Sequence, residues 1–233
     1  MGKDKLKKWE ENKTFPHVFE PHLLPIIRKE KEFEEKGKWK SEVFKNDHPL
    51  VLELGCGKGE YTVGLAQRYP DKNFIGIDVK GHRFHKGAKE SFLAGMSNVA
   101  FLRMRIEFIE AFFEKGEVDE IWITFCDPFP LDYSGHRRMT SPWYLEKYRH
   151  ICAPEFLLHL KHDNTELHRK TRREWESEGL LIEAASEDIY GDYQHEVDDE
   201  LRDLLNIRTF YESMWLKEGR RISYLRARNV LAK

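Results

Sequence analysis

The chain of 233 residues has few cysteines and no long apolar run. Its three cysteines, Cys56, Cys126 and Cys152, form an odd and widely spaced set that matches neither a disulfide framework nor paired metal ligands. No stretch approaches the roughly 18 consecutive apolar residues of a membrane-spanning helix. The lysine-rich N-terminus also lacks the apolar core of a secretory signal. We therefore expect a protein of the reducing cytoplasm, with no metal site and no membrane segment.

An excess of basic residues is also missing. The 39 Lys and Arg residues are outnumbered by 41 Asp and Glu residues, and the isoelectric point is about 6.6. Domains that bind nucleic acids usually carry a basic balance, so an RNA site would have to come from local patches. The length and a hydrophobic content of 40% suit a single packed α/β domain, which we place at residues 21–233.

Residues 1–20 are predicted to form a flexible basic arm. Lysines dominate this segment, and Trp9 and Phe15 lie between them. One interpretation is a mobile terminus. The other is an arm that becomes ordered on RNA, with its lysines on phosphates and its aromatic rings on bases. The sequence leaves both open.

Residues 51–60, VLELGCGKGE, combine an apolar run with three glycines at alternate positions. They predict a strand, a tight turn and a helix, with room for a ligand close to the backbone. The third glycine is one position too early for the dinucleotide fingerprint, and Lys58 is not followed by the Ser or Thr of a phosphate-binding loop. Glu53 beside the turn suits the ammonium or sulfonium group of S-adenosylmethionine better than a pyrophosphate. A glycine turn without a ligand is the alternative. The three glycines are Gly55, Gly57 and Gly59.

Two further acids stand at the ends of predicted strands. Strand 73–78 ends at Asp78, which we expect to accept hydrogen bonds from ribose hydroxyls, with capping of the next helix as the alternative. Strand 118–125 runs into Cys126-Asp127-Pro128-Phe129-Pro130, where the prolines end regular structure. Ligands bind beyond the carboxyl ends of strands in open α/β sheets. Asp127 is therefore the best candidate for a residue that faces both cofactor and substrate.

Other segments complete an alternating pattern of strands and helices. The basic triplet His136-Arg137-Arg138 lies on a loop near Asp127 and is well placed for phosphates, although a solvated loop also explains it. Asp163 follows another strand, and residues 209–216 predict a short helix. Seven strands with helices between them predict a doubly wound α/β sheet. The strands not yet mentioned are expected at residues 98–104, 156–160, 180–185 and 221–228.

From about Leu50 to the C-terminus, this ordered set of motifs resembles the bacterial tRNA (guanine-N(7)-)-methyltransferases. The matching segments are Glu53–Gly59 for the cofactor loop, Gly76-Ile77-Asp78 for the ribose acid, Phe125–Pro130 for an F-P-D-P-W-P segment, Arg137-Arg138 for a basic pair, Asp163 for the acid of a T-D motif and Thr209–Glu212 for a T-x-[FY]-E motif. The resemblance implies a class I methyltransferase fold, a Rossmann-like three-layer sandwich. Its seven-stranded, mostly parallel sheet has an antiparallel last strand.

The resemblance also implies methyl transfer from S-adenosylmethionine to N7 of a guanine in the tRNA variable loop. Family positions assign Glu53, Asp78 and Asp127 to the cofactor, and Asp127 is also the candidate catalytic residue. Arg105 and its neighbour Ile106 are assigned to the adenine side of the cofactor. The family usually has an acid near the position of Arg105. The guanine is assigned to Asp163, Thr209, Phe210, Tyr211 and Glu212, and RNA phosphates to Arg137 and Arg138.

Residue types agree with this chemistry. Guanine N7 is a lone-pair acceptor without a proton, so its methylation needs alignment and charge stabilisation more than a general base. Asp163 or Glu212 could select guanine by accepting from its N1–H and amino group. Two alternatives stay open, namely a methyltransferase acting on another RNA or a protein, and a tRNA-binding protein with weak or lost catalysis. Arg105 and Leu131, which replaces a family lysine, favour the latter. A monomer and a homodimer are equally compatible with the sequence.

Overall fold

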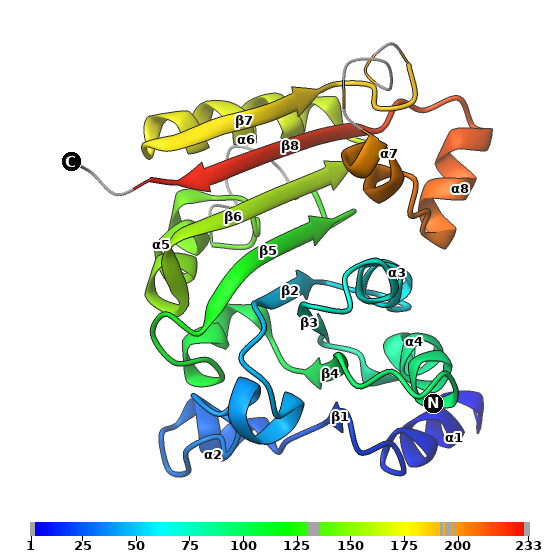
Figure 1. The fold of residues 1–233 in the computed structure, drawn as a ribbon, viewed down its shortest axis with the longest axis vertical. Coiled ribbons are helices and arrows are strands. Elements are labelled where there is room, and N and C mark those ends of the chain that lie inside the picture. The colour runs from blue at the N-terminus through cyan, green and yellow to red at the C-terminus, as the bar shows by residue number, and fades with distance from the viewer. Residues whose placement is uncertain (1–2, 130–135, 192, 194–196, 198, 231–233) are drawn as a thin grey trace.

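The computed structural model describes residues 3–129, 136–191, 193, 197 and 199–230. Its centre is an eight-stranded sheet with the order β1-β4-β3-β2-β5-β6-β8-β7 (Figure 1). Only β8 runs antiparallel to its neighbours β6 and β7 among the described strands. The strands are β1 (Val18–Phe19), β2 (Leu50–Leu54), β3 (Asn73–Asp78), β4 (Val99–Arg103), β5 (Val118–Thr124), β6 (Cys152–His162), β7 (Leu180–Ser186) and β8 (Ser223–Asn229). The predicted α/β sheet with an antiparallel last strand is confirmed.

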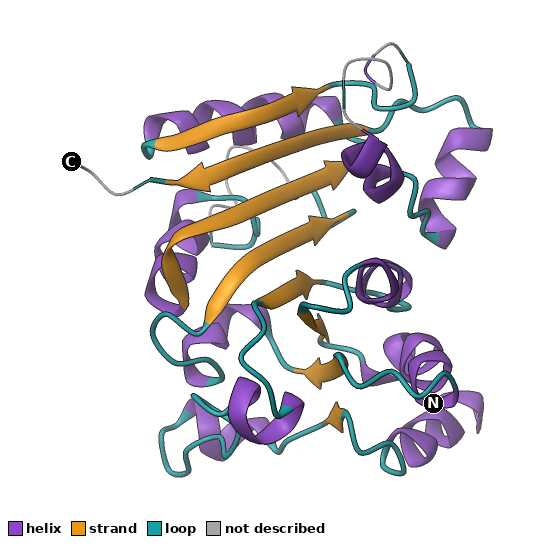
Figure 2. Ribbon diagram, viewed as in Figure 1, coloured by secondary structure: helices purple, strands orange, loops and turns teal. Residues whose placement is uncertain are grey.

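Helices cover both faces of the sheet, which makes the three layers visible in Figure 2. Trp175 of α6 and Leu145 of α5 belong to the core on one face, and Tyr61 of α3 and Phe84 of α4 to the core on the other. The helices are α1 (Lys3–Asn12), α2 (Leu23–Ile27), α3 (Glu60–Arg68), α4 (Gly81–Leu93), α5 (Pro142–Ile151), α6 (Thr165–Ser177), α7 (Asp199–Leu205) and α8 (Phe210–Lys217), with a π-helical turn at Trp39–Phe44 and a 3₁₀ turn at Ile106–Ala111.

Central strands are buried on both faces. Every residue of β2 and β3 is buried, including Glu53 and Asp78. Parallel strands with helices on both sides read as near-continuous apolar runs, which is why the sequence revealed them. An acid within such a run must find hydrogen-bond partners inside the protein. The burial therefore directs attention to the contacts of these two carboxyl groups.

The structure differs from the flexible arm predicted for residues 1–20, as far as they are described. Helix α1 packs on α4, and β1 adds a strand by pairing in parallel with β4, so the sheet has eight strands and not seven. Phe15 is 6% exposed, and the Trp9 ring lies 6.3 Å from that of His82. These aromatic rings gain more from burial against the domain than from exposure. Phe15 is thus not free to stack on an RNA base, whereas Trp9 is only partly buried.

Helix α7 is not among the elements expected from the sequence, because it lies in an acidic stretch after β7. Its buried residues Leu201 and Leu205 join the core that contains α3. None of the described helices is long and apolar enough to cross a membrane. The three cysteines are buried and free. Within the described residues no cluster of three or more His, Cys, Asp or Glu side chains could hold a metal ion.

Candidate active site

A pocket of about 590 Å³ lies at the carboxyl ends of β2, β3, β4 and β5. Its wall includes six residues that the sequence singled out, namely Gly55, Asp78, Arg105, Ile106, Asp127 and Arg137. The remaining wall residues are Val79, Lys80, Arg83, Met104, Glu107, Phe125, Cys126, Met139 and Tyr144. The fold thus brings the glycine turn, the second-strand acid and the Asp127 loop to one cavity. The other singled-out residues, Glu53, Gly57, Gly59, Arg138, Asp163 and Thr209–Glu212, are not part of this wall.

The glycine turn depends on backbone conformations that other residues rarely adopt. Gly55, Gly57 and Gly59 have φ values of 76°, 55° and 75°, all left-handed. The amide of Gly55 donates to the carbonyl of Ile77 at 2.8 Å, which fixes the turn over β3. A Cβ on Gly59 would stand 2.6 Å from the Phe101 ring. Gly55 therefore borders the pocket, whereas Gly59 permits close packing behind it.

Asp78 connects the turn to the pocket. Its Oδ2 accepts from the Gly57 amide at 3.1 Å, and its Oδ1 accepts from the Lys80 amide at 2.8 Å. Burial raises the pKa of Asp78, while these two hydrogen bonds and the charges of Arg83 and Lys80 oppose the rise. A carboxylate has about four acceptor positions, so two remain for ribose hydroxyls. Asp78 is not the N-cap of the next helix, since Lys80 takes that position in α4. The ribose role stays a prediction.

Glu53 lies beneath the turn and makes contacts within the protein. Its Oε1 accepts from the Thr124 hydroxyl at 2.6 Å, and its Oε2 accepts from the Thr62 amide at 2.8 Å and from the Thr62 hydroxyl. Burial raises the pKa of Glu53 to about 7, although the hydrogen bonds from Thr124 and Thr62 oppose the shift. Glu53 links β2, α3 and β5. It supports the turn from below and does not face the pocket.

The Asp127 loop is held in an uncommon backbone conformation. Phe125 and Phe129 have positive φ values of 50° and 43°, which are unfavourable for bulky residues and occur most often at functional sites. The Phe125 amide donates to the Lys161 carbonyl at 2.9 Å, and His162 Nε2 donates to the Cys126 carbonyl at 2.6 Å. These bonds to β6 leave Asp127 exposed on the pocket wall.

Asp163 lies beyond the end of β6 and outside the pocket wall. Its Oδ2 accepts from Arg220 at 2.9 Å, and its Oδ1 lies 3.3 Å from Nδ1 of His162. The Asp163 side chain is 10% exposed, whereas Arg220 is 50% exposed. Because Arg220 is half exposed, water competes for its side of the ion pair, and the arginine can be exchanged for another partner. Asp163 can therefore take up a substrate donor if Arg220 moves aside.

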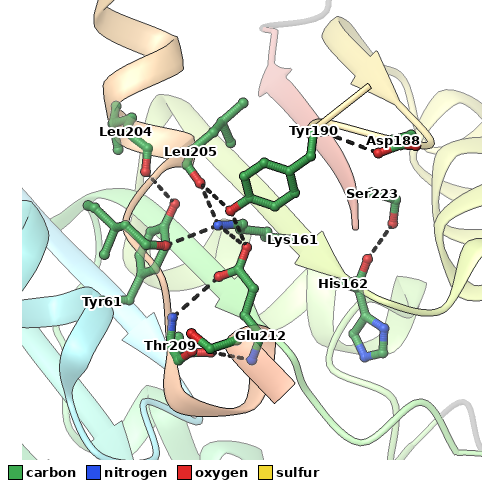
Figure 3. Close-up of polar contacts among 12 residues, drawn as sticks. Tyr61, Lys161, His162, Asp188, Tyr190, Leu204, Leu205, Thr209, Glu212 and Ser223 are labelled. Atoms are coloured by element: carbon green, nitrogen blue, oxygen red, sulfur yellow. Dashed lines mark hydrogen bonds and ion pairs between the residues drawn. The ribbon is translucent and has the colours of Figure 1, made fainter. Parts of the chain in front are cut away.

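The segment Thr209–Glu212 begins α8 with a capping box. The Thr209 hydroxyl accepts from the Glu212 amide at 3.1 Å, and the Glu212 carboxylate accepts from the Thr209 amide at 3.3 Å. The Glu212 side chain is fully buried and forms an ion pair with Lys161 at 2.7 Å (Figure 3). Phe210 and Tyr211, by contrast, are 49% and 45% exposed. Of this motif, the two aromatic rings are what a base could reach.

The two arginines of the basic pair have different surroundings. Arg137 is exposed on the pocket wall. Arg138 is 2% exposed, and its Nη2 donates to both oxygens of Glu174 on α6, at 2.6 and 2.7 Å. Arg137 is thus available to a phosphate, whereas Arg138 joins the loop to α6.

Sequence reasoning missed two residues of this region. Arg83 of α4 lines the pocket, and Lys161 of β6 holds Glu212. Arg83 gave no signal, because it reads as one of several charges on an amphipathic helix. Lys161 did give one, since a lysine at the end of the apolar run Phe156–Leu160 must be either exposed or paired.

Comparisons with known proteins show which family this sequence resembles. A family model described as "Putative methyltransferase" matches residues 47–225. The tRNA (guanine-N(7)-)-methyltransferase of Bacteroides thetaiotaomicron is 46% identical over 228 residues, covering 98% of this chain and 86% of the relative. That of Christiangramia forsetii is 45% identical and covers 97% of this chain and 98% of the relative.

Solved structures support the same fold at low identity. A 16S rRNA (adenine(1408)-N(1))-methyltransferase from Catenulisporales acidiphilia, solved with S-adenosylmethionine, has a TM-score of 0.60 at 14% identity, covering 87% of this chain and 94% of that one. An Aquifex aeolicus methyltransferase has a TM-score of 0.52 at 14% identity over 98% of this chain and all of that one. Together with the motifs and the pocket, these matches show that the chain belongs to the tRNA (guanine-N(7)-)-methyltransferase family.

Proposed function

We propose that the protein transfers a methyl group from S-adenosylmethionine to N7 of a guanine in the variable loop of tRNA. The observation that carries this proposal is the single pocket wall shared by Gly55, Asp78 and Asp127. It combines a backbone turn for the cofactor, an acid for its ribose and an exposed acid where a substrate enters. The names of the relatives supply the substrate class. We also propose that the protein acts in the cytoplasm, where tRNA matures.

The residues present fit S-adenosylmethionine. The buried Asp78 carboxylate keeps acceptor capacity toward the pocket, and Met104 and Ile106 offer apolar surface on the adenine side. Arg105, near the position where the family usually has an acid, forms an ion pair with Glu107. Glu107 also lines the pocket, so a carboxylate is present on this part of the wall. When bound, the cofactor supplies an electrophilic methyl group on a sulfonium.

The protein's own contribution is alignment and charge stabilisation. Guanine N7 has a free lone pair, so no residue need remove a proton before the reaction. Asp127 would orient the base and offset the positive charge that it acquires. Asp163 would accept from the guanine N1–H and amino group, and Arg137 would hold a phosphate. Each of these three groups lies beyond the carboxyl end of β5 or β6.

Labelled S-adenosylmethionine and unmodified tRNA provide the test. Methylated guanine is mapped by reductive cleavage of the strand, and the proposal predicts cleavage at one guanine of the variable loop. Transfer to a different RNA position would mean another substrate. Tight tRNA binding without methyl transfer would mean that catalysis has been lost. The Arg105–Glu107 ion pair on the cofactor side would then explain the loss.

A further inference from the structure

We propose that Lys161 and Glu212 form a buried positioning pair that fixes the exposed turn Thr209–Tyr211 beside the cofactor pocket. Glu212 then influences guanine recognition through the placement of this turn and does not contact the base. The inference rests on the proposed function, because the turn is taken to face the tRNA. It assigns Lys161, a residue outside the family motifs quoted above, to the substrate side of the site.

Lys161 is held by three acceptors and has no exposed surface. Its ammonium donates to the carbonyl of Leu205 at 2.7 Å and to that of Ile207 at 3.1 Å, and it lies 2.7 Å from Oε1 of Glu212 (Figure 3). An ammonium has three N–H donors, so all of them are used. Lysine is almost never fully buried unless it is paired. Its place at the end of β6 is therefore tied to the segment that supplies all three acceptors.

That segment lies outside the sheet. Residues 205–212 run from the last residue of α7 through the first turn of α8 and contain no strand. The Lys161 side chain is thus a direct polar link between a central strand and the turn that starts α8. Its backbone carbonyl accepts from the Phe125 amide at 2.9 Å, at the start of the Asp127 loop. One residue therefore holds both the catalytic loop and the α8 turn, which are the two sides of the proposed substrate site.

Burial and contacts within the protein separate the Glu212 carboxylate from a guanine. Its Oε1 contacts Lys161 and accepts from the Tyr190 hydroxyl at 2.7 Å, and its Oε2 accepts from the Thr209 amide at 3.3 Å. The whole residue is 0% exposed. A base could reach this carboxylate only if α8 left its place. Glu212 therefore anchors the start of α8, and its exposed neighbours Phe210 and Tyr211 are the groups that can contact a base.

What the anchor positions is a pair of aromatic rings. Phe210 and Tyr211 follow Thr209 directly and are about half exposed. The Lys58 ammonium lies 3.4 Å from the centre of the Phe210 ring and Tyr211 stacks on Trp215, so an unpaired base would stack on the remaining faces of these rings. A second bond locates the turn, because the Phe210 amide donates to Glu60 of α3 at 2.8 Å. Further along α8, the Trp215 ring lies 5.0 Å from that of Phe125. A shift of the anchor would move the rings relative to Asp127.

The test is a double-variant cycle on the full-length protein. Lys161→Met, Glu212→Gln and the combined variant are assayed for kcat, for the KM of tRNA and for the Kd of S-adenosylmethionine. We expect each single variant to raise the tRNA KM at least about tenfold while the cofactor Kd changes less than about threefold. In the Lys161→Met background, Glu212→Gln should add little, because the pair is already broken. Effects that multiply in full would overturn the proposal.

A base analogue separates positioning from contact. Inosine lacks the amino group of guanine, so tRNA carrying inosine at the target position reports on any bond to that group. Positioning predicts that Glu212→Gln slows methylation of both tRNAs by the same factor. A direct contact predicts that guanine loses more than inosine, and that result would refute the proposal. This comparison uses the ratio of two substrates, so partial loss of folded protein does not affect it.

Two further variants keep the test decisive. Lys72→Met breaks an ion pair with Glu120 at the opposite ends of the strands, so it should leave the tRNA KM unchanged and serves as the matched control. If neither single variant binds cofactor, Tyr190→Phe replaces them, since it removes one bond to Glu212 without a charge. A twofold or larger rise in tRNA KM supports the anchor, and no change contradicts it. If the wild type binds tRNA but transfers no methyl group, the proposed function fails, and tRNA Kd replaces KM in the same cycle.

Discussion

Replacing Glu53 by glutamine tests whether this carboxyl group supports the cofactor turn or faces the cofactor. Glu53 is 3% exposed, and its oxygens accept from Thr62 and Thr124. A glutamine has the same shape. Its carbonyl can accept both bonds from Thr62 while its amide donates to the Thr124 hydroxyl oxygen. The variant therefore imitates the protonated acid at every pH.

The expected magnitude follows from the raised pKa. The folded-state pKa of about 7 exceeds the ordinary value of 4.5, because burial disfavours the charged carboxylate. The stability that Glu53 contributes is thus fully present below pH 4.5 and is lost as the pH rises through about 7. Over the whole range the loss is ~3 kcal/mol. Between about pH 6 and pH 8.5, the wild type should lose about 1 kcal/mol relative to Glu53→Gln.

Urea unfolding followed by circular dichroism at the two pH values measures this difference, with a cofactor titration at each. Because Glu53 is not on the pocket wall, the Kd of S-adenosylmethionine should change by less than about threefold. A stability difference that does not vary with pH would refute the raised pKa. A Kd increased by more than about tenfold in a variant of unchanged stability would show instead that Glu53 contacts the cofactor.

Three other predictions follow from the site. Asp127→Ala should lower kcat of tRNA methylation by at least about 10²-fold; near-normal turnover would remove Asp127 from the site. Gly59→Ala should destabilise the protein more than Gly116→Ala, because both glycines have φ near +75° but only a Cβ on Gly59 meets a ring. Thermal melts compare the two, and equal losses would contradict the packing role. Arg137→Ala should weaken tRNA binding and reduce its salt dependence by about one charge, whereas Arg138→Ala should cost about 2 kcal/mol of stability, because Glu174 loses the Nη2 group that donates to both of its oxygens. The opposite pattern in binding and unfolding assays would reverse the two assignments.

Local sequence patterns were sufficient to predict most of the sheet and part of the pocket wall. The seven strands β2–β8 follow short apolar or alternating stretches, and the glycine spacing defines a turn whose backbone conformation other residues rarely adopt. Asp78 ends β3 and Asp127 lies three residues after β5. Both were recognisable because parallel strands bring their carboxyl ends together. Chain connectivity alone places such residues at one edge of the sheet.

The N-terminal segment shows where a local pattern was insufficient. Lysines with interspersed aromatic residues predict an arm when taken alone, yet β1 pairs with β4, more than eighty residues further along the chain. The pairing Val18 with Phe101 depends on a strand edge that exists only after the sheet has formed. A two-residue strand carries no periodic signal of its own.

The sequence by itself determined the fold class, the family and the residues at the cofactor turn, because these depend on spacing along the chain. Only the tertiary structure decided what three charged groups do. Glu53 meets Thr124, Arg138 meets Glu174 and Glu212 meets Lys161, in each case across at least 36 residues of chain. A charge in a sequence looks the same whether it will face a ligand or a buried partner. Burial removes the water that would otherwise compete for it, and burial is a property of the assembled layers.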